Sequence, residues 1–290
     1  MKKILEIKNL TKYYGKTLGV KDLSLELNKG EIFGFIGPNG AGKSTTIRSI
    51  MNLINKTAGE VYFEGQRLEK DNINQKQKIG YLPSEIHLYD DMTVKELLDY
   101  HETFYHPKPH DKRCELVKRL NVDETKKIEE LSLGNLKKVG IILAFMHSPK
   151  LLILDEATSG LVPVMQEEFY KLLKEEQEKG TTIFYSTHIL NEVPKICDRV
   201  GIIKDGHLLK IEKIEELKDK ELTFVTIISK EIDKLEKELK ITPLEKTKDM
   251  IKIKNTLEIN SLIKILGKYK IEKLFIEKAT LEEVFLHYYK

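Results

Sequence analysis

One nine-residue stretch limits what this chain can fold into more than any other part of the sequence. Residues 37–45 match the phosphate-binding (P-loop) pattern of a glycine, four residues and then Gly-Lys-Ser. Glycines allow positive φ angles and let backbone N–H groups approach phosphate oxygens. The lysine places a positive charge on the β- and γ-phosphates, and the serine hydroxyl ligates Mg²⁺. The predicted nucleotide site is made of Gly37, Pro38, Asn39, Gly40, Ala41, Gly42, Lys43, Ser44 and Thr45.

The residues on both sides of this loop support the prediction. Residues 31–36 form a short apolar run, as expected of a buried strand. Apolar residues from Ile47 to Ile54 recur at helical spacing, so we expect a helix that begins near Lys43 and directs its N-terminus at the anion. The alternative is a glycine-rich turn that contains a lysine by chance. Such a turn would not be expected to have a strand directly before it and a helix directly after it. Upstream, residues 3–9 and 20–27 are predicted strands.

A second apolar run, residues 151–156, ends in two acids. The run has no polar alternation, which is typical of a parallel strand buried in the middle of an α/β sheet. Carboxylates at the C-terminal end of such a strand lie in the crevice where these sheets bind ligands. Asp155 fits the acid that holds Mg²⁺ beside a P-loop, and Glu156 fits a general base for an attacking water. Two buried acids without a function would be costly.

Three more candidates are less specific. His188 follows a further buried strand, residues 181–186, and a histidine at that tip reaches a γ-phosphate, although a lone histidine is more often structural. Tyr14 would stack on a nucleobase if exposed, or pack on the first sheet if buried, and the sequence leaves both open. Ser132 and Gly134 lie in a turn before a helix, whose N-terminus is a second candidate anion site.

Composition excludes several other classes. The 290 residues include 49 basic and 46 acidic side chains, and the two signs are interspersed, so the net charge of +3 does not predict a nucleic-acid surface. No run approaches the roughly 20 apolar residues of a membrane helix. The two cysteines, Cys114 and Cys197, are far apart, which indicates a reducing compartment. The histidines between 101 and 110 are interrupted by two prolines, so we expect no metal site there.

The order of these motifs resembles the nucleotide-binding subunit of ABC transporters, over about residues 3–215. The motifs after the P-loop are Leu-Ser-Leu-Gly-Asn at 131–135, Leu-Leu-Ile-Leu-Asp-Glu at 151–156, Thr-Ser-Gly-Leu-Val-Pro at 158–163 and Ser-Thr-His at 186–188. The resemblance implies an α/β fold, a P-loop NTPase of ABC type. This fold has a RecA-like core, an antiparallel β subdomain and a helical subdomain at about 84–147, within a nucleotide-binding domain of residues 1–215.

The resemblance also implies roles for matching residues. Tyr14 corresponds to the aromatic that stacks on adenine, and the residues around Lys43 to the phosphate cradle. Glu156 corresponds to the general base, and His188 to the histidine on the γ-phosphate. Mg²⁺ is expected on Ser44, Asp155 and Ser84. Ser132 and Gly134 correspond to residues that reach the γ-phosphate of an opposite subunit, so a head-to-tail dimer, with an identical or a different chain, is implied.

Three positions depart from the family pattern. Ser84 stands where glutamine is usual, and it is short enough to need a bridging water to touch Mg²⁺. Leu133 and Asn135 replace a glycine and a glutamine, which makes the turn bulkier. Val162 replaces an aspartate that normally links the two sites across the dimer, so slow or partner-dependent hydrolysis is expected.

Residues 216–290 lie outside the motif set. Their pattern predicts the order β-α-β-β-α-β, a small α+β accessory module of ferredoxin-like type, and a last helix that begins at Thr280. This module resembles the C-terminal extension of the branch that exports drugs, antibiotics and peptides. Dimer contact, regulation and simple stabilisation all remain open as its role.

The functional hypothesis is an ATP-hydrolysing subunit that dimerises around two MgATP and powers export through a separate permease. Its expected location is the cytoplasmic face of the cell membrane, as a peripheral protein, with the permease and a second nucleotide-binding subunit as partners and no nucleic acid. The alternative is an ATP-dependent dimerising switch with weak hydrolysis. The transported substrate is not identified by this sequence.

Overall fold

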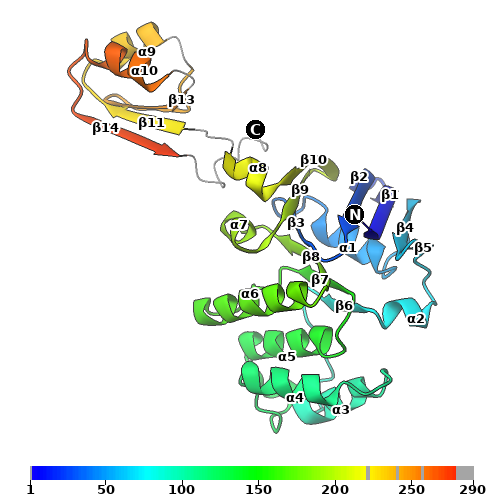
Figure 1. The fold of residues 1–290 in the computed structure, drawn as a ribbon. Helices are drawn as coiled ribbons and strands as arrows, with labels where there is room; N and C mark the ends of the chain where they lie inside the picture. Colours follow the sequence, from blue (N-terminus) through cyan, green and yellow to red (C-terminus); the bar gives the residue numbers. More distant parts are fainter. Residues whose placement is uncertain (1, 220–222, 240–241, 256–257, 279–290) are drawn as a thin grey trace. The chain divides into compact units, whose positions relative to one another are not determined.

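The computed structural model describes residues 2–219, 223–239, 242–255 and 258–278 (Figure 1). The chain divides into two compact units, Met1–Ile214 and Glu215–Lys290, and each has an apolar core of its own. None of the helices in the described ranges is both long and apolar enough to span a membrane.

A six-stranded sheet forms the centre of the first unit, in the order β10-β9-β3-β8-β7-β6. All neighbours are parallel except β10, which pairs antiparallel with β9. Every residue of β3, β7 and β8 is buried, as expected of central strands without polar alternation. The strands are β3 (Ile32–Ile36), β6 (Ile79–Leu82), β7 (Leu151–Asp155), β8 (Thr182–Thr187), β9 (Arg199–Lys204) and β10 (His207–Lys213).

A second, antiparallel sheet has the order β2-β1-β4-β5. Its strands are β1 (Lys3–Tyr14), β2 (Thr17–Asn28), β4 (Ala58–Phe63) and β5 (Gln66–Arg67). The first two strands are longer than predicted, because the ladder continues to the pair Tyr14 and Thr17. Register shifts in this part of the ladder, where Asn9 has a φ of 50°, break the alternation on which the prediction depended.

Helix α1 (Lys43–Ile50) packs between the two sheets. Ile47 and Ile50 share one apolar cluster with residues of both sheets, so the helix that follows the P-loop is fixed by the core. The helix ends at Ile50 and does not continue to Ile54, because Asn52 has a φ of 54°, which a right-handed helix does not accommodate.

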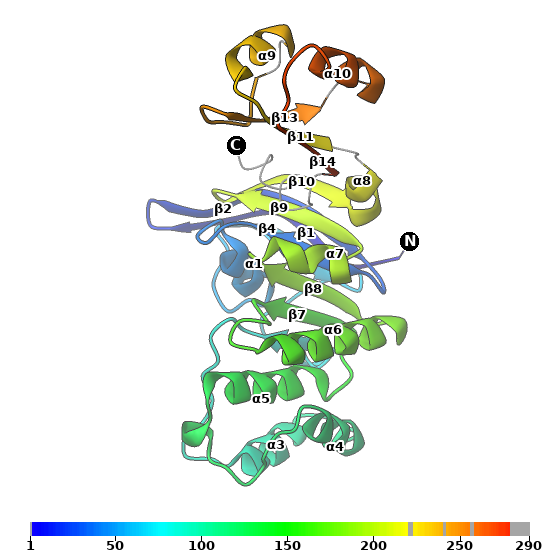
Figure 2. The same ribbon diagram turned by 90° about the vertical axis from the view of Figure 1, so that its left-hand side faces the viewer.

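The remaining helices of this unit form layers beside the central sheet. In Figures 1 and 2, α5 lies between α6 on one side and the pair α3 and α4 on the other. Thr93 and Glu96 form a capping box that begins α3. The elements are α2 (Ile73–Lys76), α3 (Val94–Glu102), α4 (His110–Arg119), η1 (Ile128–Glu130), α5 (Leu133–Phe145), α6 (Pro163–Glu178), η2 (Leu190–Glu192) and α7 (Val193–Ile196).

The second unit contains an antiparallel sheet in the order β12-β13-β11-β14. Apolar residues of β11, β13 and two helices form its core. The elements are β11 (Thr223–Ile228), α9 (Ile232–Leu239), β12 (Glu245–Lys246), β13 (Met250–Asn255), α10 (Ile259–Leu266) and β14 (Lys273–Lys278), after α8 (Ile214–Asp219). The helix predicted from Thr280 lies outside the described residues.

Candidate nucleotide-binding site

The loop between β3 and α1 requires glycine at two positions. Gly40 and Gly42 have φ angles of 79° and 105°, in the left-handed region. A Cβ added to Gly42 would lie 2.5 Å from the carbonyl oxygen of Gly19 on β2, so the backbones are too close for a side chain. Because α1 begins directly at Lys43, the free N–H groups of its first turn adjoin the loop, as an anion site requires.

The Lys43 ammonium is held by the loop itself. Its Nζ donates to the carbonyl oxygens of Gly37 at 2.8 Å and Pro38 at 3.1 Å, and it lies 3.6 Å from Glu156 Oε1. Burial lowers the pKa of Lys43, and the carboxylates of Glu156 and Asp155 oppose that shift. The residue is 5% exposed, so its charge is already placed beside the loop and the acids.

Asp155 is the last residue of β7 and is 1% exposed. Neither of its carboxylate oxygens has a hydrogen-bond partner among the described residues. A buried carboxylate in this state is costly, and carboxylate oxygens are the ligands that Mg²⁺ prefers. The donor set therefore fits a divalent cation that would share Asp155 with the Ser44 hydroxyl on α1.

Glu156 and His188 meet at the tips of adjacent parallel strands. Glu156 follows β7 and His188 follows β8, and Glu156 Oε1 lies 3.1 Å from His188 Nδ1. The backbone of Glu156 has a φ of 49°, and its N–H donates to the Ser186 carbonyl at 3.0 Å. Lys43 at the start of α1, Glu156 after β7 and His188 after β8 thus form one cluster.

A cavity of about 380 Å³ lies over this cluster. The predicted residues Ser84 and Tyr14 both line it, and Tyr14 is 47% exposed, so its ring does not pack under the first sheet. The Lys12 Nζ lies 4.9 Å from the ring centroid of Tyr14. The full lining is Tyr14, Leu18, Gly19, Asn39, Gly40, Gly42, Lys43, Ser44, Thr45, Ser84 and Glu156.

Ser132 and Gly134 are not part of that lining. The other predicted site residues outside it are Gly37, Pro38, Ala41, Asp155 and His188. Ser132 caps α5 by accepting from the Asn135 N–H at 3.4 Å, and Gly134 is the second residue of the same helix. Leu133 between them is 67% exposed, and its side chain lies against Gly160 in the loop after β7. A single chain therefore presents this turn on its surface, separate from its own nucleotide cavity.

The sequence analysis missed Lys137, which is 2% exposed on α5. Its Nζ donates to the carbonyl oxygens of Pro83 and Ser84, each at 3.2 Å. Burial lowers the pKa of Lys137, and Asp155 and Glu156 oppose the shift. The available signal was a lysine between Leu136 and Val139, on the face of α5 that the apolar spacing predicts to be buried.

Comparisons with known proteins now place this architecture in a family. The family model described as ABC transporter matches residues 20–159. The linearmycin resistance ATP-binding protein LnrL of Bacillus subtilis is 38% identical over 213 residues, which cover 72% of this chain and 68% of LnrL. The chain belongs to the ABC transporter ATP-binding subunits. It binds ATP and hydrolyses it, as the cassettes of this family do.

Two more similarities extend the family assignment of this ABC subunit. The bacitracin transport ATP-binding protein BcrA of Bacillus licheniformis is 36% identical over 222 residues, covering 75% of this chain and 72% of BcrA. The solved dimeric post-hydrolysis cassette MJ0796, bound to ADP and phosphate, has a TM-score of 0.66 and 27% identity. That alignment covers 73% of this chain and 99% of MJ0796.

Proposed function

We propose that this ABC subunit dimerises head to tail around two MgATP and powers export through a separate membrane permease. The observation that carries the proposal is the cluster of Lys43, Glu156 and His188 under the P-loop cavity. The names of two relatives support export, since LnrL is a linearmycin resistance protein and BcrA a bacitracin transport protein. The proposed location is the cytoplasmic face of the membrane, where a peripheral subunit reaches both ATP and the permease.

In the proposed mechanism, ATP binding first replaces the hydrogen-bond partners of Lys43. The Lys43 Nζ leaves the carbonyls of Gly37 and Pro38 for the β- and γ-phosphates of ATP. Ser44 and Asp155, with Ser84 through a water, would hold Mg²⁺, which supplies positive charge to the phosphate oxygens when bound. These groups are placed before reaction, so little reorganisation is needed.

Glu156 then takes a proton from the water that attacks the γ-phosphate. His188, 3.1 Å from the Glu156 carboxylate, orients that carboxylate and contacts the γ-phosphate. Tyr14 supplies an exposed ring at the cavity rim on which adenine stacks. Ser132 and Gly134, which a single chain presents away from its own cavity, close the site of the opposite subunit.

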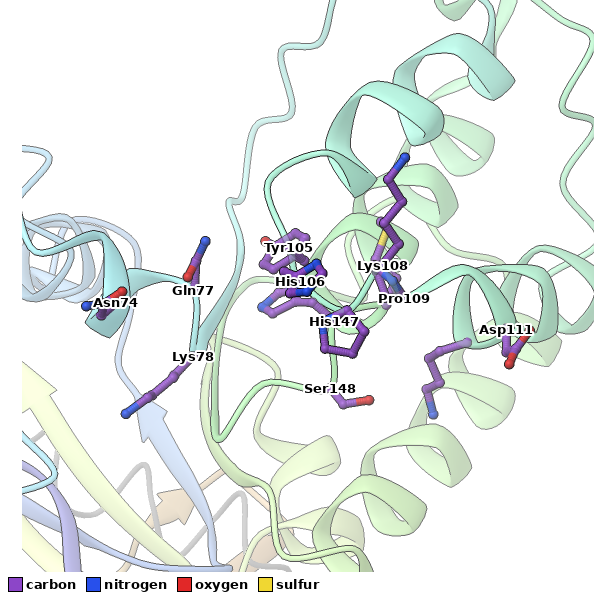
Figure 3. A pocket seen from close by; sticks show the side chains of 13 residues that line it. Asn74, Gln77, Lys78, Tyr105, His106, Lys108, Pro109, Asp111, His147 and Ser148 are labelled. Carbon is purple, nitrogen blue, oxygen red and sulfur yellow. The ribbon is translucent and has the colours of Figure 1, made fainter.

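The proposed docking site for the permease is a cavity of about 790 Å³ (Figure 3). Tyr105 and His147, whose rings stack with centroids 4.3 Å apart, are among its lining residues. Gln77 bridges its two walls by donating to the Phe104 carbonyl at 2.6 Å. α5 leads from Ser132 to this cavity, so a rigid rod of about 20 Å connects the permease to the turn that meets the opposite nucleotide.

Residues 216–290 form, in this proposal, an accessory module of ferredoxin-like type appended to the nucleotide-binding domain of residues 1–215. The helical subdomain at about 84–147 belongs to the domain, and the module acts in dimer contact or regulation. Its removal after residue 215 tests these roles. A change in the dimerisation constant with unchanged monomer stability supports dimer contact, whereas altered turnover at full dimerisation supports regulation.

The experiment for the general base is Glu156→Gln, which keeps the shape of the side chain and removes its basicity. The variant is expected to bind MgATP and accumulate a closed dimer, measured by size-exclusion chromatography with light scattering and by phosphate release. Glu167→Gln, at an exposed carboxylate on α6, is the matched control. Turnover at the wild-type rate in Glu156→Gln would remove Glu156 as the base.

The second candidate function is an ATP-dependent dimerising switch with weak hydrolysis. The exposed apolar side chains of Leu133 (67%) and Val162 (61%) favour it, because they stand where the family has a glycine and a coupling aspartate. Phosphate release from the purified dimer discriminates between the two. Tight MgATP binding with negligible release favours the switch, and rapid release with dimer dissociation favours the transport motor.

A further inference from the structure

A buried carboxylate lies behind the nucleotide site. Glu192 is 4% exposed and ends the short turn η2, four residues after His188. Its neighbours come from the loop after β7, from α6 and from β8. Four hydroxyl groups donate to it: Thr158 Oγ1 (2.6 Å) and Tyr170 OH (3.0 Å) to Oε1, and Tyr185 OH (2.6 Å) and Thr187 Oγ1 (2.8 Å) to Oε2.

The donor directions in this network are determined by its geometry. The Thr187 hydroxyl accepts from the Ile189 N–H at 3.0 Å, so its own proton points to Glu192. Burial and the charge of Glu192 hold the pKa of Tyr185 well above its ordinary value, so this phenol stays protonated and donates. The four donors occupy the acceptor positions of the carboxylate, two at each oxygen. Each hydroxyl is therefore tied to Glu192.

Two of the four hydroxyls adjoin the reacting groups in sequence. Thr158 is two residues after Glu156, and Thr187 is the residue before His188. The carboxylate thus joins the loop that carries Glu156 to the strand tip that carries His188. Glu156 has a φ of 49°, a conformation that a residue with a side chain keeps only when its surroundings hold it.

We propose that Glu192 is a positioning residue, which keeps Glu156 and His188 in register for attack on the γ-phosphate. The inference rests on the roles proposed above for those two residues. Glu192 lies behind them and acts only through Thr158 and Thr187. Loss of a contact on the loop side shifts Glu156 relative to the attacked phosphate, and a misplacement on the order of 1 Å costs roughly 100-fold in rate.

Two matched variants test the proposal, because each deletes one hydroxyl that donates to the same Oε1. Thr158→Val removes the contact on the loop that carries Glu156, and Tyr170→Phe removes the contact from α6. Both are expected to lower the unfolding temperature. Thr158→Val is expected to lower kcat by about tenfold or more with KM for MgATP within about twofold, whereas Tyr170→Phe keeps kcat within about twofold of wild type.

A second measurement uses Glu192→Gln alone and combined with Thr158→Val. If Thr158 acts through Glu192, the double variant has a kcat no lower than the worse single variant. Equal kcat losses for Thr158→Val and Tyr170→Phe, or additive losses in the double variant, overturn the proposal. If the proposed ATPase function itself were wrong, the result would be different. The wild-type protein would release no phosphate, or Glu156→Gln would turn over ATP at the full rate.

Discussion

Replacement of Lys137 by methionine tests how helix α5 is joined to the nucleotide cavity. The Lys137 Nζ donates to the carbonyls of Pro83 and Ser84, each at 3.2 Å, and Ser84 lines the cavity. Methionine keeps an unbranched apolar stem of similar length and removes the ammonium. The substitution therefore measures the effect of losing the two hydrogen bonds while it keeps the packing of this side chain, which is 2% exposed.

The magnitude follows from what each group loses. A hydrogen bond that involves a charged group contributes about 1.5–3 kcal/mol, and Lys137→Met removes two such bonds, both to partly buried carbonyls. Part of this loss of stability is offset, because the variant has no ammonium group to desolvate on folding. The same desolvation lowers the pKa of Lys137 in the wild-type protein. A net loss of about 2 kcal/mol in the free energy of unfolding corresponds to a fall of about 4–8 °C in Tm.

The assay is thermal unfolding together with KM for MgATP, since release of the Ser84 backbone changes the cavity wall. KM is expected to rise several-fold. Lys138→Met is the matched control, because Lys138 is the next residue of α5 and is partly exposed. A Lys137→Met protein that unfolds at the wild-type temperature with the wild-type KM would refute the assignment of a linking role to this ammonium.

Three further perturbations have defined expectations. Val162→Asp restores the polar group usual in the family, and phosphate release per subunit is expected to increase; an equal or lower rate contradicts a limiting role for Val162. Gly42→Ala would place a Cβ 2.5 Å from the Gly19 carbonyl oxygen, and it is expected to abolish ATP binding, measured by calorimetry. Gly30→Ala, whose Cβ would lie in open space, is expected to retain ATP binding. Burial lowers the pKa of His147 from 6.5 to about 4. The free energy of unfolding that depends on neutral His147 is therefore fully present above pH 6.5, and about 3 kcal/mol of it is lost as the pH falls towards 4. In acid titrations followed by circular dichroism, His147→Phe is expected to lose less stability than the wild-type protein between pH 7 and 4.5.

Part of the fold was predictable because its signals are local. The P-loop glycines, the apolar runs in β3 and β7, and the two acids Asp155 and Glu156 are each recognised from neighbouring residues in the sequence. Parallel strands place their C-terminal ends at one edge, so Glu156 and His188 were predictable at the same edge of the sheet. Their contact depends on β7 and β8 being neighbours, which the strand order decided. The bulged parts of β1 and β2 were not predictable, because bulges remove the alternation that identifies a strand.

The sequence by itself determined the family, the P-loop and the acids at the end of β7, since these depend on residue types at fixed spacing. Only the tertiary structure decided the roles of Lys137 and Glu192. Their partners lie 53 and 54 residues away for Lys137 and up to 34 residues away for Glu192, on separate elements. A buried charge is recognised by what surrounds it, and those surroundings exist only after the strands and helices have packed.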